Sequence, residues 1–323
     1  MNPEPLGWSL LLAGLLAALL RAATPILLAA LGGLISDLVG SINVALEGLM
    51  LAAAFFAVMA SVYAGQWFPW LSPVWHPWIG CLAGVLAALS LSAMLAVFHL
   101  EWGADLIVAG IAVNILAAGL TVLLLATLVG DKGSTAALNS PVLPSLHLPS
   151  VAGWPWLDVL LNGADGRGHH VLVYAALLTA PLLAFFLKRT RYGAWLRAVG
   201  ENREAALNAG IPVRRVQYAA LLLSGLLAGL GGIYLSMGYL SLFQADMTAG
   251  RGFLALAAIF LGARSVAGTF GAAMLFGAST VLATQLGARQ IPTQLVYMVP
   301  PLVTLLALVA AGARRRRQAS RTS

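Results

Sequence analysis

The sequence has little charge. Asp, Glu, Lys and Arg together make up 9% of its 323 residues, and 60% of the residues are hydrophobic. A soluble domain carries about 25% charged and about 45 to 50% apolar residues. This composition excludes a soluble globular protein and indicates a polytopic membrane protein. Long runs such as LLAGLLAALL and VLLLATLV predict helices, because a transmembrane β-barrel shows alternating segments of about ten residues instead.

Cysteine is nearly absent as well. Cys81 is the sole cysteine, so the chain cannot form an internal disulfide, and the redox compartment stays undetermined. The amino-terminal stretch MNPEPLGWSL has no basic residue before its apolar run, unlike a signal peptide. We therefore expect the first helix to remain in the mature protein.

Sequence motifs for catalysis are also missing. There is no GxxxxGK[ST] motif, and neither lysine, Lys132 or Lys188, follows a glycine, so the chain carries no P-loop. HExxH and GxSxG are absent too. We expect a protein that is not an enzyme and that holds no cofactor and no metal.

The positive charges gather at the ends of apolar runs. The net charge is +7; one basic group lies within 188–191, and another is the run Arg314 to Arg317. Because Lys and Arg collect on the cytoplasmic side of membrane proteins, these groups predict topology rather than nucleic-acid binding. They place a loop, 188–216, and a basic tail, 313–323, in the cytoplasm.

The apolar segments form one membrane domain, 1–323. The predicted fold class is all-α, a polytopic membrane helical bundle of about 8 to 10 transmembrane helices with a cytoplasmic coupling helix. The segments lie at about 8–34, 43–64, 78–99, 105–129, 171–187, 217–239, 252–287 and 292–312.

The segment 252–287 is too long for one crossing, because about 36 residues of helix measure about 54 Å. A single crossing would also put Arg314 to Arg317 on the opposite side from the other basic group. A break around Arg264 removes this conflict. We expect a short first half that either begins near Met247 or is a discontinuous helix lining a cavity.

This topology puts two long loops outside. The loop 130–170 predicts an irregular extracytoplasmic cap, and we expect its pair His169 and His170 at the surface, because no Cys or carboxylate stands at ligand spacing. The loop Gln66 to Trp78 holds four tryptophans, which favours an aromatic belt; a carbohydrate-stacking platform is the alternative. The topology also places 244–250 outside, and 36–43 and 101–105 inside.

Arg21 lies in the middle of the first segment, near Thr24 and Pro25. An ionisable group in a transmembrane helix costs about 2.5 to 3.5 kcal/mol on insertion scales and usually faces a cavity. We expect two pieces of helix with Arg21 at the interface. One helix with a buried cation is the alternative.

A few other polar residues interrupt the apolar runs. Asn43 and Glu47 are four residues apart, so we expect them on one helix face. For Glu47 the sequence leaves two interpretations, a carboxylate that pins helix packing or a contact with the solute, and Asn114 has the same two. The candidate translocation path is Asn43, Glu47, Asn114 and Gln285.

The loop 188–216 contains AVGENREAALNAGIPVRR. Asn202 is a good N-cap, and Gly210 followed by Pro212 is typical of a helix end. These signals predict a helix of about seven residues over Arg203 to Ala209, which is too short to be stable alone. We expect a shallow face of Ala205, Ala206 and Ala209 with a polar rim of Arg203, Glu204 and Asn208.

Four motifs in order resemble the permease subunits of bacterial ABC importers in the branched-chain amino acid and ribose superfamily: SDLVGSINVALEGLMLAAAFF, YGAWLRAVGENREAALNAGIPVRRVQ, LLSGLLAGLGGIYLSMG and MTAGRGFLALAAIFLG. The resemblance covers roughly residues 24–310. It looks closest to the nucleoside and simple-sugar branch, whose members pair with basic-membrane-protein-type lipoproteins. Asp37-Leu38-Val39 departs from the Glu-Arg-Ser that relatives often show there.

The resemblance implies that a separate ABC ATPase subunit uses the ATP and that a coupling helix on this chain docks on it. It also implies a second homologous permease, an extracytoplasmic solute-binding lipoprotein, and a multi-pass location in the lipid of the bacterial cell membrane. We expect alternating-access uptake of a nucleoside or simple sugar. A branched-chain amino acid or ribose permease and an ion-coupled secondary transporter are the alternatives. The implied coupling helix comprises Glu201, Asn202, Arg203, Glu204, Ala205, Ala206, Ala209 and Gly210.

Overall fold

The computed structural model describes residues 5–131, 133–149, 153–163 and 166–287, and the single residues 302, 303 and 309. In this part of the chain, seven helices are long and apolar enough to cross a membrane, and a further apolar helix is shorter. The predicted all-α membrane bundle is therefore confirmed. The expected last segment and the basic tail fall almost wholly outside the described residues.

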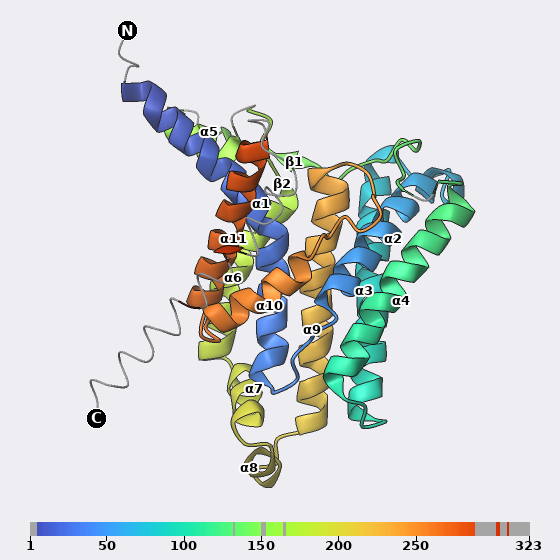
Figure 1. Cartoon of the computed structure of the whole chain (residues 1–323), viewed down its shortest axis with the longest axis vertical. Coiled ribbons are helices and arrows are strands. Elements are labelled where there is room, and N and C mark those ends of the chain that lie inside the picture. The colour runs from blue at the N-terminus through green and yellow to red at the C-terminus, as the bar shows by residue number, and fades with distance from the viewer. Residues whose placement is uncertain are drawn as a thin grey trace.

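The helices form an upright bundle with short elements at both ends (Figure 1). We call the end that carries α8 the α8 end, and the opposite one the α5 end. The spanning helices are α1 (Pro5–Leu38), α2 (Leu46–Trp67), α3 (His76–Leu100), α4 (Leu106–Leu128), α6 (Val171–Arg189), α9 (Val213–Tyr234) and α11 (Val266–Gly287). The shorter elements are η1 (Pro73–Trp75), β1 (Ser145–Leu146), α5 (Pro155–Asn162), β2 (His169–His170), α7 (Arg191–Glu201), α8 (Arg203–Asn208), η3 (Leu235–Tyr239) and α10 (Arg251–Leu261).

Helix α1 runs without interruption through Arg21 and Pro25. The expectation of two pieces is therefore wrong, and the alternative of one helix carrying a cation holds. Pro25 lacks the N–H that would bond to the carbonyl of Arg21, one turn earlier. A membrane helix tolerates this defect when its surroundings are packed, and α1 packs against α9, α10 and α11.

Helix α2 begins at Leu46, later than the apolar segment suggests. Residues 39–45 are irregular and rise from the α8 end into the bundle (Figure 1). Asn43 therefore precedes the helix, and the expectation that it shares a helix face with Glu47 is wrong. Hydropathy misses this because an apolar segment buried in protein has the same composition whether it is helical or irregular.

The predicted break around Arg264 is confirmed. Helix α10 ends at Leu261 and α11 begins at Val266, and both Ala263 and Arg264 have left-handed φ angles, 52° and 57°. Helix α10 begins at Arg251 rather than near Met247, so its 11 residues give about 16 Å, half a crossing. The two helices form a discontinuous pair.

The predicted grouping of the loops is confirmed. At the α8 end, Arg214 at the start of α9 forms an ion pair with Glu101, which follows α3. At the α5 end, the Ala245 N–H donates to the Gly133 carbonyl at 2.8 Å. The α2–α3 connection, with its exposed tryptophans, also lies at the α5 end (Figure 1).

The loop 130–170 contains more secondary structure than expected. It contains α5 and the short antiparallel pair β1–β2. His169 and His170 are both buried, so the expectation of a surface pair is wrong. They are buried because β2 pairs with β1 and because the His170 ring packs edge-on against the Tyr234 ring, with 5.6 Å between the ring centroids. Among the described residues no three His, Cys, Asp or Glu gather at a metal-binding distance.

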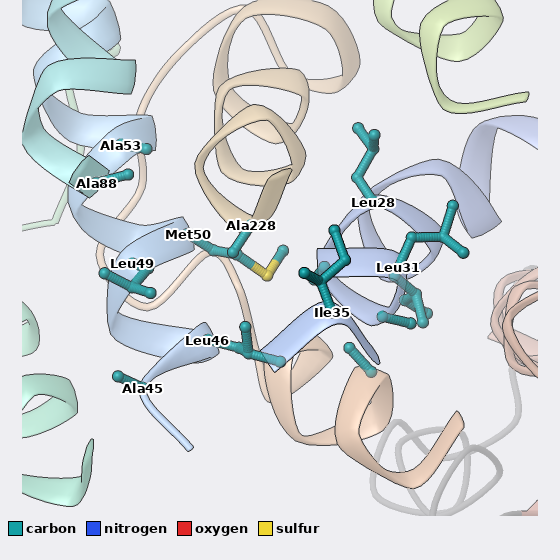
Figure 2. Close-up of a cluster of buried hydrophobic side chains, with 14 of the residues drawn as sticks. Leu28, Leu31, Ile35, Ala45, Leu46, Leu49, Met50, Ala53, Ala88 and Ala228 are labelled. Atoms are coloured by element: carbon teal, nitrogen blue, oxygen red, sulfur yellow. The ribbon is translucent and has the colours of Figure 1, made fainter. Parts of the chain in front are cut away.

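The core lies where α1, α2, α3 and α9 meet. Figure 2 shows Ile35 of α1 beside Met50 of α2 and Ala228 of α9. The approach of α9 is close at Gly232, where an added Cβ would meet the Met50 carbonyl. Small residues thus let these helices pack at backbone contact.

Candidate functional site

Helix α8 projects from the α8 end of the bundle, between α7 and α9 (Figure 1). The Asn202 side chain accepts a hydrogen bond from the Ala205 N–H at 3.0 Å, which is the predicted N-cap. Gly210 has a φ of 76°, and the Ile211 N–H donates to the Ala206 carbonyl at 3.0 Å. The predicted cap and stop are confirmed, and the helix ends at Asn208, one residue early.

The face of α8 is not the one expected. Ala206 is 3% exposed because α8 packs against α7 and α9; its place on an open docking face is a wrong expectation. Leu207 is 49% exposed, an apolar side chain that the alanine pattern did not single out. The exposed residues of this segment are Glu201, Asn202, Arg203, Glu204, Ala205, Leu207, Asn208, Ala209 and Gly210.

Helix α7 connects α8 to the membrane bundle, and the sequence did not predict this helix. Thr190 caps its start by accepting from the Gly193 N–H at 3.1 Å, while Leu196 and Val199 are buried. A Cβ at Gly200 would lie 2.0 Å from the Leu38 carbonyl. The end of α7 therefore packs directly against the backbone at the end of α1.

A second contact joins α1 to the broken helix pair. The Asp37 carboxylate pairs with Arg264, from Oδ2 to Nε at 2.9 Å and from Oδ1 to Nη2 at 3.1 Å. A cavity of about 260 Å³ opens beside this pair, and Arg197 and Glu201 of α7 also line it. Helix α7, the end of α1 and the α10–α11 break thus meet at one place.

The two candidate asparagines serve the irregular segment 39–45. Asn43 donates to the Ser224 hydroxyl and accepts from the Ala45 N–H, both at 3.0 Å. Asn114 accepts from the Gly48 N–H at 2.7 Å and donates to the Val44 carbonyl at 2.9 Å. For Asn114 this is the interhelical interpretation. These amides satisfy backbone groups that would otherwise be unpaired in the membrane.

Glu47 serves the start of α10 in the same way. Its two carboxylate oxygens accept from the Gly250 N–H at 2.7 Å and the Gly252 N–H at 2.6 Å. A helix N-terminus favours an anion, so the carboxylate pins helix packing. The structure supports that interpretation over contact with the solute.

The surroundings of Gln285 differ from those of the other three candidate path residues. It is exposed on α11 and lines a cavity of about 190 Å³ together with Arg21 of α1 and Tyr239 of η3. The other three candidate path residues do not line this cavity. Asn43, Asn114 and Glu47 lie near the start of α2, on other contacts.

The comparisons with known proteins agree on one family. Residues 15–308 match the model described as "Branched-chain amino acid transport system / permease component". The chain is 34% identical over 301 residues to the guanosine ABC transporter permease protein NupQ of Bacillus subtilis, covering 90% of this chain and 89% of that one.

Two further relatives differ in their named solutes. The nucleoside ABC transporter permease protein NupC of Lactococcus lactis is 31% identical over 303 residues, covering 91% of this chain and 90% of NupC. The putative glucose ABC transporter permease protein TsgC13 of Haloferax volcanii is 31% identical over 247 residues, covering 76% of this chain and 70% of TsgC13.

Proposed function

This chain belongs to the family of permease components of branched-chain amino acid transport systems, and we propose that it carries a nucleoside across the membrane as the permease subunit of an ABC importer. One observation carries the substrate class: the identity of 34% and 31% to a guanosine and a nucleoside permease extends over about nine tenths of the chain.

In the proposed importer, the α8 end faces the cytoplasm and α8 docks on a separate ATPase subunit. The capped, exposed α8 supports this role, as does the contact between Gly200 and the Leu38 carbonyl, because together they allow α8 to act as a lever on α1. A second homologous permease and an extracytoplasmic solute-binding lipoprotein complete the assembly. The transport step is alternating access, in which the permease exchanges between two conformations. ATP at the α8 end and the loaded lipoprotein at the α5 end shift this equilibrium.

A secondary transporter that couples to protons or sodium ions needs free carboxylates along its path. In the described spans Glu47 is occupied by two backbone N–H groups and Asp37 by Arg264. This arrangement favours the importer over the secondary transporter.

Uptake by living cells tests the substrate class. A strain that lacks this gene is compared with the same strain carrying it on a plasmid, using labelled guanosine, glucose and leucine. We expect guanosine uptake to fall in the deletion strain and to return with the plasmid, while leucine uptake stays unchanged. Loss of leucine uptake alone would contradict the proposal.

The second candidate solute is a simple sugar, which the 31% identity to a putative glucose permease favours. The same experiment decides between them. If glucose uptake falls and guanosine uptake does not, the sugar is the solute.

A further inference from the structure

Two arginines from distant parts of the chain line one small cavity in the spanning part of the bundle. Arg21 of α1 and Arg251 of α10 both border a space of about 10 Å³, with Tyr239 of η3 and Thr280 of α11. The adjoining cavity of about 190 Å³ shares Arg21, Tyr239 and Thr280 and continues to Gln285. Tyr239 and Gln285 are exposed, so this cavity opens on the surface of the subunit.

Neither arginine forms an ion pair with a described residue. Arg251 donates through Nη1 to the Met247 and Thr248 carbonyls, both at 3.1 Å, and lies within electrostatic range of Glu47. Arg21 forms no ion pair and no hydrogen bond with the described residues. A guanidinium inside the membrane faces water or protein rather than lipid. This face of the subunit is therefore expected to meet water or protein rather than lipid.

The backbone is irregular around the same cavity. Helix α9 continues as the π-helical segment η3, which ends at Tyr239, and Pro25 breaks the hydrogen-bond pattern of α1 beside Arg21. Segments of π-helix occur frequently at functional sites. The irregularity turns the Tyr239 ring, which is 45% exposed, toward the cavity that Arg21 borders.

We propose that Arg21, Tyr239 and Gln285 form a binding site on the translocation path for the base of a 6-oxopurine nucleoside. This inference rests on the proposed function. A guanidinium donates two parallel N–H groups to the O6 and N7 acceptors of such a base, whereas adenine presents a donor in place of O6. Aromatic rings stack on any base, and Tyr239 supplies one.

The remaining polar groups fit the sugar. The hydroxyls of Thr280 and Thr284 already donate to backbone carbonyls within α11, so each keeps lone pairs that accept from ribose hydroxyls. The Gln285 amide both donates and accepts. Arg251, held by its two carbonyls, borders the same small space as Arg21 and keeps the site positive as a positioning residue.

Cysteine labelling tests whether the site holds the solute. In the assembled importer in proteoliposomes, with Cys81 replaced by serine, Gln285→Cys is compared with Leu123→Cys, a control that is exposed on α4. We expect a charged methanethiosulfonate reagent to label Q285C and not L123C, and guanosine to slow the labelling of Q285C more than adenosine does. Labelling that guanosine leaves unchanged, or no labelling of Q285C at all, would overturn the site.

Uptake kinetics test the role of Arg21. In Arg21→Gln, we expect the apparent KM for guanosine to rise about tenfold relative to wild type, since a bidentate contact is worth about that factor, while the KM for adenosine stays unchanged. Arg21→Lys keeps the charge but not the planar pair of N–H groups, so it is expected to lose part of the same preference. An unchanged ratio of guanosine to adenosine uptake in R21Q would overturn this inference alone. Absence of nucleoside uptake by the wild type would overturn the proposed function and this inference with it.

Discussion

Glu47 of α2 and Gly252 of α10 are joined at the point where α10 begins. The Gly252 N–H donates to Oε2 of Glu47 at 2.6 Å, and a Cβ on Gly252 would lie 2.5 Å from the Glu47 backbone nitrogen. The carboxylate thus occupies a helix N-terminus that in a discontinuous transporter helix is often offered to an anionic substrate group. Glu47 therefore fills this position itself and stabilises the fold.

Glu47→Ala is therefore expected to lower the stability of the protein. It leaves the N–H groups of Gly250 and Gly252 without a partner, and each buried unpaired group costs about 1 to 3 kcal/mol. The thermal midpoint of the purified protein in detergent measures the loss, with Glu204→Ala on the exposed surface of α8 as the control. An E47A midpoint equal to that of E204A would contradict the capping role.

Gly200→Ala is expected to disturb the contact between α7 and α1. The added Cβ would lie 2.0 Å from the Leu38 carbonyl, so the end of α7 must move away from the bundle. We expect ATP-driven uptake to fall strongly and the thermal midpoint to change little, because the contact that joins α7 and α8 to α1 is disturbed while the bundle itself is not. Gly119→Ala is the control: nothing lies within 4 Å of a Cβ there, and a helical Ala gains about 0.5 to 1 kcal/mol over Gly. Equal uptake by both variants would show that the contact transmits nothing.

His170 predicts a pH dependence of stability. Burial lowers its pKa to about 4 from a usual value of 6.5, so between these values the unfolded chain binds the proton more readily than the folded one. The stability due to neutral His170 is complete above pH 6.5 and is lost as the pH falls toward 4, by about 3 kcal/mol at most. Thermal midpoints between pH 7.5 and 4.5 measure it. The fall should be smaller in His170→Gln, and parallel curves for the two proteins would contradict the assignment.

Ala205→Arg is expected to weaken binding of the ATPase subunit while the membrane domain stays folded. Ala205 is exposed on α8, whereas Ala206 is buried, so an arginine at position 206 would instead damage the packing of this chain. Co-purification of the ATPase with A205R and wild type measures the effect. Normal recovery of the ATPase on A205R, with a normal yield of the permease, would place the docking surface elsewhere.

The parts of the fold that were predicted from sequence depend on charge and on local caps. Lys and Arg collect on one side of a membrane protein. The few basic groups of this chain could lie on the same side only if the segment 252–287 was broken, and this predicted the break at Arg264. The Asn202 cap and the Gly210 stop are local hydrogen-bond signals, and the structure shows both.

The parts that were missed depend on tertiary packing. The orientation of α8 follows from its contacts with α7 and α9, and a six-residue helix has too few positions to show a face by itself. The irregular segment around Asn43 has the composition of a helix, and its amide partners lie far away in the chain, at Ser224 for example. Arg21 and Arg251 come together only because α10 begins inside the bundle.

The central claim is that a separate ATPase drives this chain through α8. The most direct measurement is the initial rate of labelled guanosine uptake into proteoliposomes that contain the purified permease with its partner permease and the loaded lipoprotein. We predict uptake only when both the ATPase subunit and ATP are present, and none with a proton or sodium gradient alone. Uptake driven by an ion gradient without the ATPase subunit would contradict the account.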